Sequence, residues 1–290
     1  MCRIAYINNE ILNKIEVGVL SDYFVSLEKS QGGHGNGVAF FHKKHPLLLK
    51  GVKLPAPDCA KYVKSHDKIR NGILFHTRFA TAGARNDEMA QPFIVQGNIY
   101  AHNGDERNYK IIKIILNRQG IQIPPDSSDS KIFSILASRY GIDILKKTDS
   151  NWAVLTKQGL WASGNFDALV QSNKRILMLG SELSYWKDLI SGPNIEFIRI
   201  VADGTDFSKT GPIFSYKNIH TSFLGNAKSC GMCGDDINTF GNHNAKQNLC
   251  ISCEIGMENY SDTELKKSTI RCLRCKYPAD FCICDEENNE

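Results

Sequence analysis

A cysteine stands directly behind the initiator methionine, at position 2 of the 290-residue chain. Removal of Met1 would leave Cys2 with both a thiol and a free α-amino group. An α-amino group has an ordinary pKa of about 7.7–8.0, so it can accept the thiol proton near neutral pH. Nucleophile and base would then belong to one residue, as in enzymes with an N-terminal threonine nucleophile. Small residues are common at position 2, so this pattern needs support from the rest of the chain.

An arginine follows an apolar run, residues 72–75, that is expected to form a buried strand. At the end of such a strand, the guanidinium of Arg78 can recognise a carboxylate through two parallel hydrogen bonds. A structural ion pair is the alternative for a single arginine. Phe79 and Thr81 follow, and the polar loop at residues 82–90 is expected to close over a bound substrate.

Asn103 and Gly104 follow a second expected strand, residues 98–102. An asparagine amide and a glycine N–H are donors that can stabilise the oxyanion formed when a thiolate attacks a carbonyl. Loss of one such donor typically lowers the rate about 10²–10³-fold. Asn-Gly is also a common hairpin turn. Residues 105–119 have apolar side chains at helical spacing, which favours a strand-to-helix junction with a favourable helix dipole near the oxyanion.

Asp129 lies in a Ser-Ser-Asp-Ser segment, residues 127–130, ahead of apolar residues at helical spacing. Serine and aspartate at this place predict a helix N-cap. The side chain of Asp129 itself is expected to be free at the start of this helix.

Cys2, the His76-Thr77-Arg78 segment and the His102-Asn103-Gly104 turn together resemble the class II glutamine amidotransferases. These N-terminal-nucleophile enzymes release ammonia from glutamine through a γ-glutamyl thioester. The resemblance covers about residues 2–220, which are expected to form the glutaminase domain. It implies that Cys2, Asn103 and Gly104 are catalytic. It also implies that the substrate is bound by Arg78, Phe79, Thr81 and Asp129, with Arg78 on the carboxylate and Asp129 on the α-amino group.

Some positions depart from the synthases of that family. Arg3 replaces a common glycine and agrees with the branch that begins Met-Cys-Arg, which includes γ-glutamyl amide and peptide hydrolases. The glycine-rich segment at residues 31–37 lacks the family's Arg-Gly-x-Asp sequence and is interpreted as a turn in which His34 is structural. Phe79 stands in place of a tryptophan, and Ala82 in place of a histidine. These changes leave hydrolysis possible and bear on closure and on coupling to an acceptor.

The expected fold class is α+β, a four-layer αββα sandwich of the N-terminal-nucleophile hydrolases, with two helix layers enclosing two sheets. Strands are predicted from alternating or continuous apolar residues, and helices from apolar residues at helical spacing. The predicted strands are residues 2–7, 38–41, 72–78, 98–102, 152–156, 160–163, 176–179 and 195–201. The predicted helices are residues 60–69, 105–119 and 130–140. Cys59, beside the first helix, is expected to be a partly buried thiol.

Eight of the ten cysteines lie between residues 230 and 290, in closely spaced pairs. In a reducing compartment such pairs indicate a metal site and not disulfides. Residues 226–290 are therefore expected to form a zinc-ribbon-like module with two structural zinc ions, each held by four thiolates. The pairs could close two consecutive sites or interleave, and an iron–sulfur cluster is the alternative. The expected ligands are Cys230, Cys233, Cys250, Cys253, Cys272, Cys275, Cys282 and Cys284.

The charge is distributed unevenly. Residues 226–290 carry seven Lys/Arg and eleven Asp/Glu, a net charge of −4. Because the whole chain has a net charge of +4, residues 1–225 carry +8. An acidic metal module suits a protein partner better than direct nucleic-acid binding, which would then occur only through that partner. No apolar run approaches the about 20 residues of a membrane span, and no signal-peptide pattern is present, so a cytoplasmic protein is expected.

Three functional hypotheses follow. The first is a glutaminase subunit that hydrolyses the γ-amide of glutamine and delivers ammonia to a separate acceptor partner, since residues 226–290 are too few for an acceptor domain. The second is a γ-glutamyl amide or peptide hydrolase without an acceptor. The third is an inactive zinc-bearing adaptor with this fold. The presence of Cys2, Arg78, Asn103, Gly104 and Asp129 in one chain argues against the third.

Overall fold

The computed structural model describes residues 2–106, 108–173, 175–187, 189–190 and 194–207. The chain divides into two compact units. The first unit comprises Met1–Asp105, Pro125–Leu145 and Ser150–Lys217. The second comprises Glu106–Pro124, Lys146–Asp149 and Asn218–Glu290. The eight cysteines of the expected zinc module, and the expected boundary between residues 220 and 226, lie outside the described residues.

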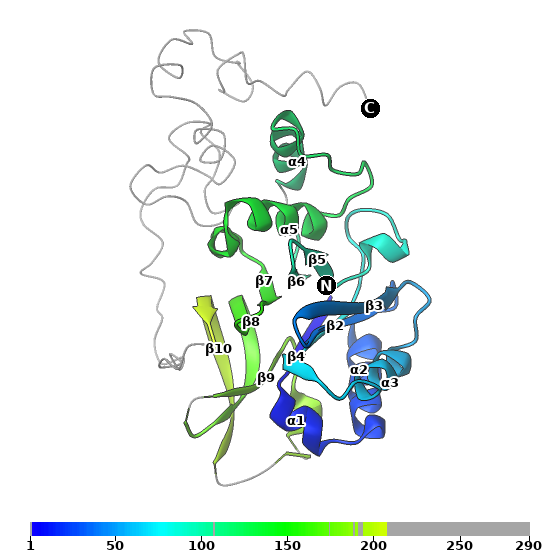
Figure 1. Cartoon of the computed structure of the whole chain (residues 1–290), viewed down its shortest axis with the longest axis vertical. Helices are drawn as coiled ribbons and strands as arrows, with labels where there is room; N and C mark the ends of the chain where they lie inside the picture. The colour runs from blue at the N-terminus through cyan, green and yellow to red at the C-terminus, as the bar shows by residue number, and fades with distance from the viewer. Residues whose placement is uncertain (1, 107, 174, 188, 191–193, 208–290) are drawn as a thin grey trace. The chain divides into compact units, whose positions relative to one another are not determined.

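Ten strands of the first unit form a single antiparallel hydrogen-bonded sheet (Figure 1). Its strand order is β3-β2-β4-β1-β9-β8-β7-β6-β5, and β10 pairs with β8. The strands are β1 (Arg3–Ile7), β2 (Asn36–His42), β3 (His45–Gly51), β4 (Ile69–Thr77), β5 (Phe93–Val95), β6 (Asn98–Asn103), β7 (Asn151–Leu155), β8 (Leu160–Gln171), β9 (Ile176–Gly180) and β10 (Ile195–Asp206).

The two halves of this sheet face each other. β8 is 12 residues long, and it pairs with β7 through residues 160–163 and with β9 through residues 167–170. Alternate side chains of the two halves meet in one buried cluster that includes Ile4 and Leu74 from one half and Ala101 and Ala153 from the other. The two predicted sheets are therefore the two halves of one sheet, because the long strand β8 continues the hydrogen bonding from one half into the other.

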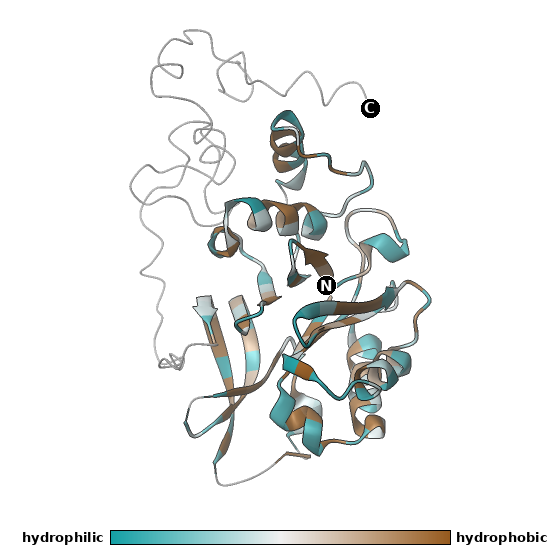
Figure 2. Cartoon of the chain, in the orientation of Figure 1, coloured by the Kyte–Doolittle hydropathy of each residue, from teal (hydrophilic) through white to brown (hydrophobic). Residues whose placement is uncertain are grey.

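Three helices cover the outer face of the half that contains β1 and β4: α1 (Asn9–Lys14), α2 (Val17–Ser30) and α3 (Ala56–Lys64). α2 buries Leu20, Tyr23, Phe24 and Leu27, an i, i+3, i+4, i+7 pattern that places all four on one face of a helix. Phe24 stacks on Phe75 of β4 with ring centroids 3.9 Å apart. In Figure 2, α2 and α3 carry both hydrophobic and hydrophilic residues, as expected of helices with one buried face.

The helix α5 (Asp129–Tyr140) covers the other half of the sheet. Its Phe133 ring lies 6.4 Å, centroid to centroid, from Trp152 of β7. The ten-stranded sheet thus lies between α1–α3 on one side and α5 on the other, so the predicted order of helix, sheet, sheet and helix layers is confirmed. Three 3₁₀ helices occur as well: η1 (Asp87–Met89), η2 (Ile142–Lys147) and η3 (Ser184–Trp186).

Several element boundaries differ from the sequence prediction. The helix predicted at residues 60–69 is α3, which begins at Ala56 with a proline in its first turn, because proline fits the start of a helix. Residues from Ile69 onward belong to β4. α1 and α2 were not predicted. The helix expected from Asp105 is α4 (Tyr109–Arg118), which belongs to the second unit.

None of the helices in the described part of the chain is long and apolar enough to cross a membrane.

Candidate active site

The site is organised by the antiparallel pairing of β1 with β4. Arg3, the first residue of β1, pairs with Thr77, the last residue of β4. Cys2 directly precedes β1 and Arg78 directly follows β4, so the register brings these two residues together although they are 76 positions apart in the sequence. Cys2 is 8% exposed and Arg78 is 3% exposed.

The Cys2 thiol is held by the backbone of Phe79. The Phe79 N–H donates a hydrogen bond to Cys2 Sγ over 3.3 Å, and Sγ lies 3.6 Å from the Phe79 carbonyl oxygen. Burial raises the pKa of the Cys2 thiol, while the Phe79 N–H and the charge of Arg78 lower this pKa, and the charge of Asp129 raises it. Burial therefore favours the neutral thiol, and the Phe79 N–H and Arg78 are placed to stabilise a thiolate once a base removes the proton.

Arg78 is fixed by the loop that follows it. Its two terminal nitrogens donate to the carbonyl oxygens of Ala82 and Ala84, both over 2.7 Å. Burial lowers the pKa of Arg78, whereas the neighbouring Cys2 and Asp129 raise it. An arginine stays charged in proteins. The two carbonyls use only part of its five N–H donors, so the others can bind an anion.

The loop at residues 82–90 packs against the start of α5. The N–H of Ala84 donates to the carbonyl of Asp126 over 3.2 Å. Gly83 has φ +72, and a Cβ there would overlap the backbone of Ser128, so glycine is required for this approach. Lys50 of β3 donates to the carbonyls of Glu88 and Ala90 at the far end of the loop. The loop is thus anchored at both ends.

Phe79 and Thr81 lie at the surface of this region. The Phe79 side chain is 44% exposed, and its ring lies 4.9 Å from the imidazole of His34 in a stacked arrangement. His34 Nδ1 accepts a hydrogen bond from the N–H of Ala80 over 2.9 Å. Burial lowers the pKa of His34, and the charges of Arg85 and Arg78 lower it further. His34 therefore holds the start of the loop, in agreement with its predicted structural role. Thr81 is exposed.

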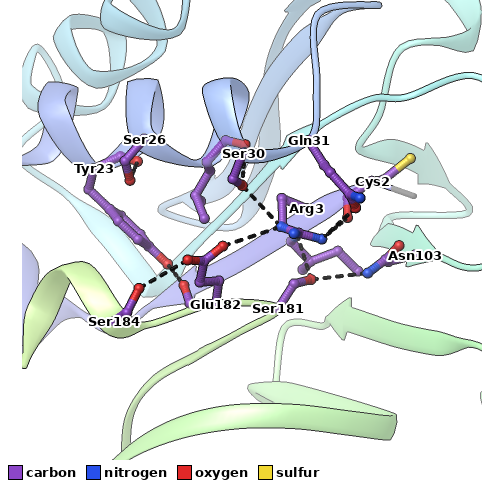
Figure 3. Close-up of polar contacts among 12 residues, drawn as sticks. Cys2, Arg3, Tyr23, Ser26, Ser30, Gln31, Asn103, Ser181, Glu182 and Ser184 are labelled. Carbon is purple, nitrogen blue, oxygen red and sulfur yellow. Dashed lines mark hydrogen bonds and ion pairs between the residues drawn. The ribbon is translucent and has the colours of Figure 1, made fainter.

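Asn103 ends β6 and is 7% exposed. Its Nδ2 donates to Ser181 Oγ over 3.2 Å, whereas its Oδ1 is buried without a hydrogen-bond partner in the described part of the chain (Figure 3). Gly104 follows, and a Cβ there would overlap the Ser150 side chain. Only glycine fits this position. Because glycine has no side chain, the backbone N–H of Gly104 is not obstructed by one.

Asp129 is the first residue of α5 and is 4% exposed. The N-cap is the preceding Ser128, whose side chain accepts from the N–H of Lys131. Asp129 Oδ1 accepts from the N–H and the hydroxyl of Ser130, so the expectation of an unengaged carboxylate was wrong. Its negative charge acts on both Cys2 and Arg78.

Ser130, which donates to Asp129, also belongs to a buried group of hydrogen-bonded side chains. The hydroxyl of Ser130 lies 2.8 Å from Nδ1 of His102 and 3.2 Å from Nε2 of Gln91. Gln91 Oε1 in turn accepts from the N–H of His102 over 2.8 Å. The sequence analysis named His102 only as part of the His102-Asn103-Gly104 turn and assigned no role to Gln91. Such buried hydrogen bonds restrict the positions of the residues that they join.

The structure thus brings Cys2, Arg78 and Asp129 within electrostatic reach of one another. It also ties Asn103 to Ser181, which directly follows β9, the neighbour of β1. No group of three or more histidine, cysteine, aspartate or glutamate side chains that could hold a metal occurs among the described residues.

No family model matches the chain. A curated relative, the glutamine–fructose-6-phosphate aminotransferase (isomerizing) of Chlamydia muridarum, is 28% identical over 182 residues. The match covers 62% of this chain and 28% of that enzyme, so the chain spans well under half of the relative's length.

Two solved structures share the fold. The glutamine phosphoribosylpyrophosphate amidotransferase of B. subtilis, complexed with ADP and GMP, gives a TM-score of 0.50 at 18% identity over 69% of this chain and 45% of that one. A structure described as the allosteric regulatory enzyme of purine biosynthesis gives 0.52 at 20% identity over 70% of this chain and 48% of that one. The part of the chain that matches these structures thus shares the fold of a glutamine amidotransferase of known structure.

Proposed function

We propose that the first unit hydrolyses the γ-amide of glutamine, with Cys2 as the nucleophile. The observation that carries this proposal is the pairing of β1 with β4, which sets a buried thiol beside a buried arginine and gives the thiol a backbone N–H donor. The name of the Chlamydia relative, a glutamine-dependent aminotransferase, supports the same reaction class.

The reaction begins with proton transfer from the Cys2 thiol to its own α-amino group, exposed after removal of Met1. The thiolate attacks the γ-carbonyl carbon, and the Asn103 amide and Gly104 N–H stabilise the resulting oxyanion. The C–N bond then breaks, and ammonia leaves with the proton from the α-ammonium. Water attacks the γ-glutamyl thioester, the α-amino group takes its proton, and glutamate and the free thiol are formed.

Substrate binding follows from the charges around Cys2. Arg78 is a buried cation with N–H donors beyond those used by Ala82 and Ala84, which suits the α-carboxylate of glutamine. Asp129 is a buried carboxylate within reach of the same cation, which suits the α-ammonium. Phe79 and Thr81 line the exposed side of the site and would contact the bound substrate.

We further propose that residues 226–290 form a module with two zinc ions that docks on a separate ammonia-accepting protein. The donor set fits zinc, because four closely spaced thiolate pairs can complete two tetrahedral sites. Since few apolar residues are available there, zinc binding would supply much of the folding free energy of the module. We place the protein in the cytoplasm, where such thiols stay reduced.

An assay of the purified full chain, with and without co-purified proteins, tests the reaction and the acceptor together. With the chain alone, ammonia and glutamate should form in equal amounts from glutamine. With the partner and its acceptor substrate present, glutamate should form faster, and free ammonia should fall short of it because the nitrogen passes to the acceptor. The Cys2→Ala variant is the control for contaminating glutaminases. Absence of hydrolysis under all these conditions would refute the enzyme assignment and leave the inactive adaptor.

A γ-glutamyl amide or peptide hydrolase is the second candidate. The backbone N–H of Phe79 binds the Cys2 thiol, and the Phe79 side chain is 44% exposed. This favours the second candidate, because an exposed aromatic side chain beside the nucleophile can bind a leaving group larger than ammonia. Comparison of kcat/KM for glutamine and for γ-glutamyl peptides decides between the two. Rapid partner-independent hydrolysis, best on the peptides, would favour this candidate.

Metal analysis of the full chain tests the docking module. The expected content is two zinc ions per chain, and iron or a clearly lower content would overturn the proposal. Removal of the metal by a chelator should abolish partner-dependent stimulation and leave hydrolysis of glutamine by the chain alone largely intact.

A further inference from the structure

Ser181 connects two parts of the candidate site. Its hydroxyl oxygen accepts a hydrogen bond from the N–H of Ile4 over 3.1 Å and another from Asn103 Nδ2 over 3.2 Å (Figure 3). Ile4 belongs to β1, two positions after Cys2, whereas Asn103 ends β6 in the other half of the sheet. A single side chain thus joins the strand that carries the nucleophile to the proposed oxyanion donor.

Ser181 is itself firmly placed. It directly follows β9, which pairs with β1 through Ala5 and Gly180. The N–H of Ser181 donates to the carbonyl of Ile4 over 2.9 Å, and the N–H of Ile4 donates back to the serine hydroxyl. These reciprocal bonds extend the β1–β9 ladder by one rung beyond Gly180.

The turn after Ser181 is fixed by further contacts. Nε of Arg3 lies 3.6 Å from a carboxylate oxygen of Glu182, and the hydroxyl of Tyr23 in α2 donates to the Glu182 carbonyl over 3.1 Å. Arg3 also donates to Ser30 over 3.1 Å and to Gln31 over 2.8 Å at the end of α2 (Figure 3). The start of β1, the end of α2 and the Ser181–Glu182 turn are therefore linked into one framework.

Asn103 depends on this framework for its orientation. The final torsion of an asparagine side chain joins an sp³ to an sp² carbon and has broad preferences, so the amide turns easily unless a hydrogen bond holds it. Among the described residues, Ser181 is the hydrogen-bond partner of this amide, because Asn103 Oδ1 is buried and unpaired. One Nδ2 hydrogen goes to Ser181 and leaves the second for another acceptor.

We propose that Ser181 is a positioning residue that holds the Asn103 amide so that its second Nδ2 hydrogen points to the oxyanion formed on the γ-glutamyl carbonyl. This inference rests on the proposed function of Cys2 and Asn103. The effect of Ser181 belongs to the transition state, because the oxyanion exists only there, and it should therefore appear in kcat more than in KM.

The first test compares Ser181→Ala with Ser184→Ala. Ser184 lies in the same short segment, is exposed, and donates to Glu182 and not to Asn103, so it is a matched control. We expect Ser181→Ala to lower kcat for glutamine hydrolysis between about 10- and 100-fold with little change in KM, since misplacement of a reacting or stabilising group by about 1 Å can cost this much. Ser181→Thr, which keeps the hydroxyl, should recover most of the rate, and Ser184→Ala should match the wild-type protein.

A double-mutant cycle separates positioning from a general structural role. Because Ser181 acts through Asn103, Ser181→Ala should lower the rate of the Asn103→Ala variant by less than about twofold. An undiminished further loss in that background would overturn the inference, as would an unchanged kcat for Ser181→Ala in an active enzyme. If the wild-type chain hydrolyses neither glutamine nor γ-glutamyl peptides, the proposed function itself fails and the inference fails with it.

Discussion

Two cysteines occur in the described part of the chain, and their surroundings differ in the features that make a thiol reactive. Both are buried, and burial raises the pKa of each. Around Cys2, the Phe79 N–H and the Arg78 charge counteract this effect. Around Cys59, on the inner face of α3, the carboxylates of Asp58 and Glu28 add to it and raise the pKa to about 12. Burial alone therefore produces an inert core thiol, and a nucleophile requires donors and positive charge as well.

The largest expected effect comes from removing each thiol in turn. Cys2→Ala should lower glutamine hydrolysis by about 10⁴-fold or more, as loss of a nucleophile does in other hydrolases. Cys59→Ala should leave kcat and KM within about twofold, and lower the free energy of unfolding by about 1 kcal/mol through the small cavity it creates. Steady-state kinetics and urea unfolding of both variants measure this. Equal loss of activity in the two would remove the distinction between the cysteines.

The next largest effect concerns the base, which Cys59 lacks. If Met1 is retained, the nitrogen of Cys2 is an amide and cannot accept the thiol proton, so hydrolysis should fall about 10²–10⁴-fold, the usual contribution of a general base. Intact-mass analysis and activity assays of preparations that retain Met1 to different degrees measure this effect. Activity should rise in proportion to the fraction without Met1. Full activity in a preparation that retains Met1 would disprove the mechanism.

The third prediction concerns Arg78, the cation near Cys2; without it, the surroundings of Cys2 would be more similar to those of Cys59. Arg78→Ala should raise KM for glutamine about 10- to 100-fold, since a charge-assisted hydrogen bond contributes about 1.5–3 kcal/mol. The pKa of Cys2 should also rise, because the charge of Arg78 lowers it in the wild-type protein. The pH dependence of thiol alkylation reports that shift.

Arg85→Ala is the matched control for Arg78→Ala, because Arg85 is an exposed arginine of the same loop. KM should change by less than about threefold in this variant, since an exposed charge contributes little. An equal rise of KM in both variants would mean that general charge, and not the placement of Arg78, governs substrate binding.

The smallest expected effect is a pH dependence of the free energy of unfolding that comes from His34, which lies near Phe79 and the Cys2 thiol. The pKa of His34 is lowered in the folded protein, and its Nδ1 can accept the Ala80 N–H only when the imidazole is neutral. The stabilisation from neutral His34 is therefore complete above the unfolded pKa of about 6.5 and is lost as the pH falls below it. The change should be about 1 kcal/mol or less, the net value of one hydrogen bond.

Urea unfolding of the wild-type protein and of His34→Asn between pH 7 and pH 5 checks this last expectation. The difference in the free energy of unfolding between the two proteins should shrink as the pH falls. His45→Asn, a change at the exposed histidine that begins β3, should leave the pH dependence unchanged. A constant difference between wild type and His34→Asn would show that protonation of His34 does not weaken the loop.

The amino-acid sequence by itself identified the residues that could carry the chemistry. Cys2 was found because it directly follows the initiator methionine, and Arg78 and Asn103 were found because each follows an apolar run that is expected to form a strand. α2 could have been found in the same way, since Leu20, Tyr23, Phe24 and Leu27 have helical spacing that the sequence analysis did not use.

Only the tertiary structure decided how these strand ends meet. The Phe79 N–H reaches Cys2 across 77 positions of sequence, and Asn103 reaches Ser181 across 78. Contacts over such separations depend on strand register and on the continuation of one sheet through β8 into two facing halves. Neither property is encoded in a local pattern, because a shift of register by one residue would turn every side chain of a strand to the other face. The candidate site therefore became visible as a site, with Ser181 in it, once β1, β4 and β9 were seen paired.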